Sequence, residues 1–223
     1  MIELVLAAVL FLVTHLGISS TPMRGALVAK IGERPYLGVY SLLAAVTIAY
    51  LIMTYLRTPQ FQYLWGPSPA LKWVPVVAMP VALVLFVGGF MVRNPTAVGL
   101  EGSIADAPRG VLRVTRHPFQ WSIVLWSSAH IIANGDVASL VFFGAFGLLS
   151  ACGSVLLDRK KAKQLGDAWA GFTSTTSNVP FGAIASGRNR LVVGELWLPV
   201  AIGLAAYVLV LFGHEWISGV AIF

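Results

Sequence analysis

The fold class follows from residues 137–157, which read VASLVFFGAFGLLSACGSVLL and contain no charged side chain. A helix rises about 1.5 Å per residue, so a run of this length covers the roughly 30 Å hydrocarbon core of a bilayer. The whole chain agrees, because 57% of its 223 residues are hydrophobic and only 11% are charged. A soluble domain carries about a quarter charged residues. An ordinary soluble enzyme, a disordered chain and a disulfide-stapled secreted module are therefore excluded.

Five further segments are long and apolar enough, or nearly so, to cross a membrane. They are Ile2–Ser19, Tyr36–Leu56, Trp73–Met91, Phe119–Ala133 and Leu196–Phe212. The sequence therefore predicts one all-α domain, a bundle of about six transmembrane helices. Asn134-Gly135-Asp136 is typical of a tight turn and makes the fourth and fifth spans an antiparallel hairpin. Pro75 and Pro80 predict a kink in the third span.

The basic residues orient this bundle in the membrane. Thirteen of the fifteen Lys and Arg residues fall in the first, third and fifth loops, and only Arg57 and Lys72 lie on the opposite side. Cytoplasmic loops carry such an excess, so we expect both termini to face away from the cytoplasm of a bacterial inner membrane. Topology thus explains the net charge of +6, and the lipid bilayer, not nucleic acid, is the expected partner.

One long stretch, residues 158–195, lies outside the predicted spans. It begins with a basic run and continues with apolar side chains at helical spacing, which are Leu165, Ala168, Trp169 and Phe172. An amphipathic helix of this kind lies in the interface plane. We expect this segment to lie along the cytoplasmic face of the membrane.

Three of the four histidines need an explanation, because an ionisable side chain inside a membrane is costly and marks a functional site by default. His15 lies inside the first span and His130 near the far end of the fourth. Two interpretations are open for each: a neutral imidazole bonded to a neighbouring group, or a metal or haem ligand. Ser127 and Asn134, at i−3 and i+4 from His130, could hold its second ring nitrogen, as a ligand histidine requires.

His117 differs from these two histidines. It stands in Arg116-His117-Pro118 at the start of the fourth span, where proline favours the first helical turn and basic residues suit a cytoplasmic interface. Thirteen residues at about 100° each put His117 and His130 on roughly opposite faces, about 20 Å apart along the axis. The two side chains cannot both bind one iron.

Haem is the cofactor that this set of residues could hold. Two histidines are too few for a structural zinc, which takes four ligands, whereas a haem needs only one or two axial imidazoles. A haem shared by His15 and His130 would be tilted, since they lie about 6 Å and about 17 Å from the cytoplasmic ends of their spans. Four glycines would leave room for a flat macrocycle or serve close helix packing: Gly88, Gly89, Gly144 and Gly147.

An ordered set of short motifs runs through most of the chain. It comprises Thr14–Gly17, Arg116-His117-Pro118, Trp126 with Ala129-His130, Asn134-Gly135, Asp158-Arg159-Lys160, Thr173–Phe181 and Gly187-Arg188. This set resembles the NnrU family, a group of bacterial membrane proteins associated with denitrification and nitric oxide metabolism. It is also similar to the zeta-carotene isomerase of plastids and cyanobacteria.

The resemblance to the isomerase implies a haem b held by a first-span and a fourth-span histidine, which fall on His15 and His130. The isomerase carries a cysteine three residues before the second of these, where this chain has Ser127. Thiolate switching is therefore not expected, and the NnrU branch is favoured. It implies redox or isomerase-like chemistry linked to nitrite and nitric oxide reduction, with a redox partner or a nitrogen-oxide reductase nearby.

Three charged residues, Arg116, Asp158 and Arg159, are candidates for the cytoplasmic wall of that site, where cations would pair with haem propionates; plain interfacial anchoring is the alternative. A fainter likeness is to the isoprenylcysteine carboxyl methyltransferase group. In that alternative, His117 and Asp158–Lys163 would line a pocket for S-adenosylmethionine. The paired glutamates expected of that group are missing, since Leu157-Asp158-Arg159-Lys160 stands in their place.

Overall fold

The computed structural model describes residues 1–18, 22–97 and 99–222. The long helices are α1 (Ile2–Leu12), α3 (Glu33–Arg57), α4 (Pro69–Met91), α6 (Pro118–Asn134), α7 (Val137–Leu165) and α10 (Trp197–Ser218). The shorter elements are η1 (Val13–Ile18), α2 (Pro22–Ile31), η2 (Glu101–Ala105), α5 (Val111–Val114), α8 (Asp167–Thr175), α9 (Gly182–Ala185) and η3 (Val193–Glu195). The prediction of an all-α bundle is confirmed: within these ranges only one isolated β-bridge occurs, between Tyr63 and Asp136.

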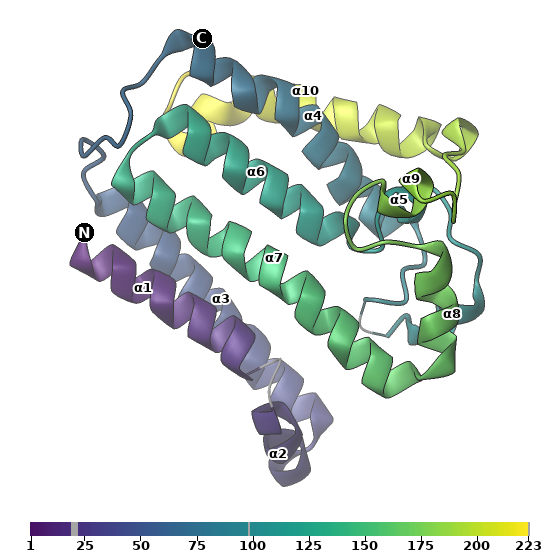
Figure 1. The fold of residues 1–223 in the computed structure, drawn as a ribbon. Coiled ribbons are helices and arrows are strands. Elements are labelled where there is room, and N and C mark those ends of the chain that lie inside the picture. The colour runs from purple at the N-terminus through teal and green to yellow at the C-terminus, as the bar shows by residue number, and fades with distance from the viewer. Residues whose placement is uncertain (19–21, 98, 223) are drawn as a thin grey trace.

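The bundle has two distinct ends. The short helices α5, α8 and α9 gather at one of them, called here the α8 end, and both chain termini lie at the other (Figure 1). Termini at the same end agree with an even number of membrane crossings. The predicted cytoplasmic face corresponds to the α8 end, and its sidedness stays a prediction.

Helix lengths support a multi-pass membrane protein. In the described residues, α3, α4, α7 and α10 are long and apolar enough to cross a bilayer, and a fifth span results if the bent pair Ile2–Ile18 and Met23–Ile31 counts as one. Helix α6 has 17 residues, or about 26 Å of rise, slightly less than a hydrocarbon core. It nevertheless packs against both α4 and α7, which places it inside the bundle.

Several helices extend beyond the spans that hydropathy outlines. Helix α3 begins at Glu33 instead of Tyr36, and α10 continues to Ser218 instead of Phe212. Helix α7 runs to Leu165, because the basic stretch after Leu157 consists of good helix formers.

Helix α4 also begins earlier than hydropathy indicates. It starts at Pro69, where the Ser68 hydroxyl accepts a hydrogen bond from the amide of Ala70 and proline occupies the first turn. It continues as one helix through Pro75 and Pro80.

The α6–α7 hairpin is confirmed at residue level. Gly135 ends α6 in the left-handed region with φ of 71°, a conformation that glycine adopts without steric cost. The Asp136 carboxylate accepts a hydrogen bond of 2.8 Å from the amide of Ser139 and caps α7. The carbonyl oxygen of Gly135 accepts from the amide of Leu64 at 2.7 Å. The loop before α4 is thereby tied to the turn.

Close packing uses three of the four glycines considered above. A Cβ atom on Gly88 would lie 2.5 Å from Val111, one on Gly147 would lie 3.1 Å from Ser127, and one on Gly89 would lie 3.2 Å from Pro118. Nothing lies within 4 Å of a Cβ on Gly144. Helix packing is thus the role of Gly88, Gly89 and Gly147, and only Gly144 borders open space.

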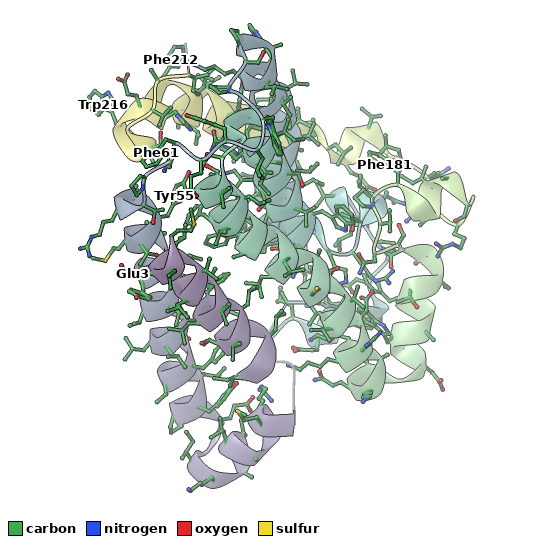
Figure 2. All side chains as sticks on the ribbon, turned by 60° about the vertical axis from the view of Figure 1, so that its left-hand side comes forward. Glu3, Tyr55, Phe61, Phe181, Phe212 and Trp216 are labelled. Atoms are coloured by element: carbon green, nitrogen blue, oxygen red, sulfur yellow. The ribbon has the colours of Figure 1, made fainter. Side chains whose placement is uncertain are left out.

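The outside of the bundle is apolar. On α10, Phe212 and Trp216 project away from the other helices (Figure 2) and are 80% and 93% exposed. In water such side chains would form a large exposed apolar surface that promotes aggregation, whereas in a bilayer they contact lipid and the headgroup region. The core between α1, α3 and α7 is built instead from small and aromatic side chains, among them Ala7, Phe11 and Phe142.

Candidate functional site

Arg116, His117 and Asp158 come together at the α8 end. The guanidinium of Arg116 donates two hydrogen bonds to the Asp158 carboxylate, of 2.9 and 2.6 Å. The Nε2–H of His117 donates a third, of 2.6 Å, and the side-chain amide of Asn178 donates a fourth, of 3.1 Å. One carboxylate thus receives four donors from the start of α6 and from the segment after α8.

Asn178 completes this cluster, and it was missed by sequence reasoning although it stands inside the Thr173–Phe181 motif. Its amide group also bonds Ser154 on α7, and its Oδ1 accepts from the indole N–H of Trp121 at 3.3 Å. Its backbone carbonyl accepts from the hydroxyl of Thr115 at 2.5 Å. The polar pattern Thr-Ser-Asn before a proline was the available signal, but nothing local to it indicated Asp158 as the partner.

The cluster fixes structure more than it offers a binding surface. The His117 side chain has no exposed area, and its Nδ1 is buried without a hydrogen-bond partner in the described residues. Arg116 is mostly buried and lies 5.9 Å from the ring centre of Trp169 on α8. His117 therefore presents no surface to S-adenosylmethionine, and Arg116 and Asp158 are already bound to each other. Arg159 is exposed and makes no ion pair with any described residue.

His15 lies in the π-helical turn η1, directly after α1. Its Nδ1–H donates to the carbonyl oxygen of Phe11 at 2.8 Å, which places the lone pair of the neutral ring on Nε2. A ligand histidine needs this orientation from a second hydrogen bond, and π-helical turns are frequent at functional sites. The ring packs 4.4 Å from that of Phe11 and 6.4 Å from that of Tyr40.

His130 has the same hydrogen-bond arrangement. Its Nδ1–H donates to the carbonyl oxygen of Trp126 at 2.8 Å. The expectation that Ser127 or Asn134 would hold this nitrogen is wrong, because helical side chains lean towards the N-terminus and reach the carbonyl one turn earlier. Asn134 donates to Ser139 at 3.0 Å instead, and the Ser127 hydroxyl is buried without a partner in the described residues.

A hollow of about 280 Å³ opens beside His15, called here the His15 hollow. It lies between η1, α3, the start of α6 and the second half of α7. Its lining is largely apolar and consists of His15, Leu16, Tyr40, Phe119, Gln120, Leu149, Ser150, Gly153, Leu157 and Lys160. Its volume is near the lower limit of small-molecule sites, which span about 300–1,000 Å³. A large ligand would be held on one side only.

The structure does not bring His130 onto the lining of this hollow. Helix α7 packs against both α1 and α6, and among the described residues a series of intervening rings connects the two histidines. Phe11 beside His15 contacts Phe146 on α7 at 4.9 Å, and Phe146 contacts Trp126 beside His130 at 5.6 Å. The His130 ring itself stacks on Phe143 at 4.9 Å. Each imidazole fits the chemistry of an axial ligand, while a haem shared by both stays a prediction.

Other metal chemistry has few candidates in this part of the chain. Across residues 1–18, 22–97 and 99–222, no group of three or more His, Cys, Asp or Glu side chains could hold a metal ion. His130 has one further imidazole neighbour, His214 on α10, whose ring centre lies 6.4 Å away. The Nδ1 of His214 is engaged with the carbonyl oxygen of Val220 at 2.9 Å.

Comparison with known proteins gives the family. The chain is 29% identical over 202 residues to the chloroplastic 15-cis-zeta-carotene isomerase of Arabidopsis thaliana and 28% identical over 204 residues to that of Zea mays. Each match covers 85% of this chain and 52% of the relative, so the chain spans about half the length of the curated relatives it matches. No solved structure matches it. The family model described as NnrU protein matches residues 3–222, and the chain therefore belongs to the NnrU family.

Proposed function

We propose that this protein binds haem b in the membrane, with His15 and His130 as axial ligands. The observation that supports this proposal is that each imidazole donates its Nδ1–H to the carbonyl four residues earlier, so that Nε2 is the unprotonated nitrogen of each neutral ring. Two half-buried histidines on different helices with the same second hydrogen bond are what axial ligation requires. The hollow beside His15 supports the proposal for that residue, whereas the ligand role of His130 rests on its bond and on the family resemblance.

The chemistry proposed for this haem is isomerase-like or redox. The two relatives are named as isomerases of a cis-carotene, an apolar substrate that would reach the protein from the bilayer. Haem, when bound, supplies an iron whose coordination and redox state the axial ligands control. In this chain, the rings of Phe11 and Tyr40 pack against the His15 ring and would limit its contact with water. We further propose a place in nitrite and nitric oxide reduction in the bacterial inner membrane, together with a redox partner or a nitrogen-oxide reductase.

In this proposal, the residue at position 127 distinguishes this chain, which has a serine there, from the isomerases. A cysteine at this place would lie one turn before His130 and could replace it as a ligand, whereas a serine hydroxyl is a poor ligand for haem iron. In the structure, the Ser127 side chain faces Gly147 and is almost fully buried. We therefore propose that the ligand set of this protein does not include the residue at 127.

The test is an absorption spectrum of the full chain, purified in detergent and supplied with haem b. We expect a Soret band in the wild type that is weakened or shifted in His15→Ala and in His130→Ala and lost in the double variant. His214→Ala, which changes the imidazole nearest His130, is the matched control and should keep the wild-type spectrum. A wild type that binds no haem, or a band that survives in the double variant, would overturn the proposal. If the Soret band is lost in His15→Ala but unchanged in His130→Ala, His130 is not a ligand.

A further inference from the structure

The His15 hollow is lined by three neutral polar side chains that have no hydrogen-bond partner. Tyr40 lines it from α3, Gln120 from α6 and Ser150 from α7. None of the three makes a hydrogen bond with any residue that the structure describes. Polar groups without a partner are costly inside a membrane protein. These side chains therefore indicate a ligand that has hydrogen-bonding atoms of its own.

Ser150 gives the clearest indication, because it is only 9% exposed. Two other buried serines of the bundle satisfy their hydroxyl groups within their own helix. Ser122 donates to the carbonyl oxygen of Phe119 at 2.7 Å, and Ser154 donates to that of Ala151 at 2.8 Å. Ser150 makes no such bond, so its hydroxyl is available to a ligand in the hollow.

The apolar part of the lining sets the size of this ligand. Leu149, Gly153 and Leu157 follow one another at intervals of four residues and share one face of α7. A Cβ on Gly153 would meet nothing within 4 Å, so the middle of this face is open. About 150 Å³ is enough for one benzene ring, and the hollow has about 280 Å³. It therefore accommodates one substituted ring, but not a macrocycle.

The ligand needs no net charge. The described lining contains no carboxylate, and its only ammonium group, that of Lys160, is exposed and has Glu101 and Glu33 as electrostatic neighbours. Hydroxyl and carboxamide groups can both donate and accept hydrogen bonds. They can therefore bind the carbonyl oxygens of a neutral ligand as well as its hydroxyl groups.

We propose that the His15 hollow binds the head group of a membrane quinone. A quinone head is a single planar ring with two carbonyl oxygens, is neutral, and reaches the protein from the bilayer. Tyr40, Gln120 and Ser150 donate to its carbonyl oxygens and, in the reduced form, accept from its hydroxyl groups. This binding does not depend on the proposed haem, whereas a role of the quinone as the redox partner of that haem would rest on the proposed function.

The experiment measures equilibrium binding of tritiated decylubiquinone to the full-length apoprotein in detergent, with protein-free micelles as the blank. We expect saturable binding of the quinone to the wild type. Decylbenzene, which has the same tail on a ring without oxygen atoms, should compete about tenfold more weakly, because it leaves the polar side chains of the hollow unpaired.

Four variants and their controls locate the site. Ser150→Ala and Tyr40→Phe each remove one hydroxyl group and should each weaken binding about fivefold. Ser122→Ala is the matched control, because its hydroxyl bonds its own helix and it does not line the hollow. Gly153→Leu fills the hollow and should abolish binding. Gly144→Leu, at an equally open position of α7 outside the lining, should bind as the wild type does.

The opposite results would overturn the inference. Equal competition by decylbenzene, or unchanged affinity in both Ser150→Ala and Tyr40→Phe, would show that the polar side chains do not recognise the ligand. Binding that persists in Gly153→Leu would place the quinone outside the hollow. Complete displacement by an equimolar amount of phosphatidylcholine would assign the hollow to a lipid ester instead. Since no haem is present in this titration, each of these results leaves the haem proposal to its own spectroscopic test.

Discussion

Replacing Asp158 by asparagine should strongly destabilise the α8 end. The substitution keeps the shape of the side chain but removes the charge that two N–H groups of Arg116 and one of His117 contact at 2.6–2.9 Å. The Arg116 side chain is only 12% exposed, so water replaces little of what is lost. Removing one partner of a buried ion pair costs about 3–5 kcal/mol. Because the Asp158 side chain is 18% exposed, we expect a loss near the lower figure, about 3 kcal/mol.

Unfolding of the detergent-solubilised chain, followed by far-ultraviolet circular dichroism, measures this loss. For a chain of this size, about 3 kcal/mol corresponds to a fall in the midpoint of roughly 6–12 °C. Asp106→Asn provides the control, because the Arg93–Asp106 pair is long at 3.6 Å and its side chains are 73% and 52% exposed. Such a pair contributes about 0.5 kcal/mol or less. If both variants unfold at the same temperature, the Asp158 cluster does not stabilise the fold as argued here.

Two further predictions concern packing and pH. Gly203→Val should cost about 1–3 kcal/mol, because a Cβ at 203 would lie 2.8 Å from the backbone of Val84. Gly144→Ala, with open space around it, should cost nothing in the same unfolding assay; equal losses would contradict the packing argument. Hydrogen bonds from Arg113 lower the pKa of Glu195 to about 2 from 4.5, so their stabilisation is present above about pH 4.5 and is lost as pH falls towards 2. Glu195→Gln should therefore be less stable than the wild type by about 1 kcal/mol near pH 6 and equal to it near pH 2; a difference that does not depend on pH would refute this assignment.

The membrane helices could be predicted from the sequence because their signal is local. An uncharged run such as residues 137–157 specifies a span without reference to the rest of the chain, and Gly135 marks the turn before it. The predicted helix ends were less accurate, because hydropathy indicates which residues can lie in lipid, whereas a helix ends where its backbone hydrogen bonds end. The extension of α7 to Leu165 is the consequence that matters most. Because the helix continues, Arg159 and Lys160, which are adjacent in the basic run, lie on different faces of α7. Of the two, only Lys160 lines the His15 hollow.

The polar cluster could be predicted only in part. Arg116, His117 and Asp158 stood out as ionisable residues near span ends, but their pairing joins positions about forty residues apart. Asn178 contributes from the segment between α8 and α9, whose course depends on the packing of α8, and Ser154 contributes from α7. Such contacts arise from tertiary structure, and a single sequence carries no periodic signal for them.

The π-helical turn from Val13 to Ile18 has a consequence for how this site could change over time. A π turn holds one residue more than an α turn. His15 is the third residue of this turn, so loss of Val13 or Thr14 would move the imidazole by one helical position relative to α1, a rotation of up to about 100°. A descendant protein could thus retain its imidazole, its length to within one residue and its hydropathy profile, and still aim the ring away from the hollow that it lines.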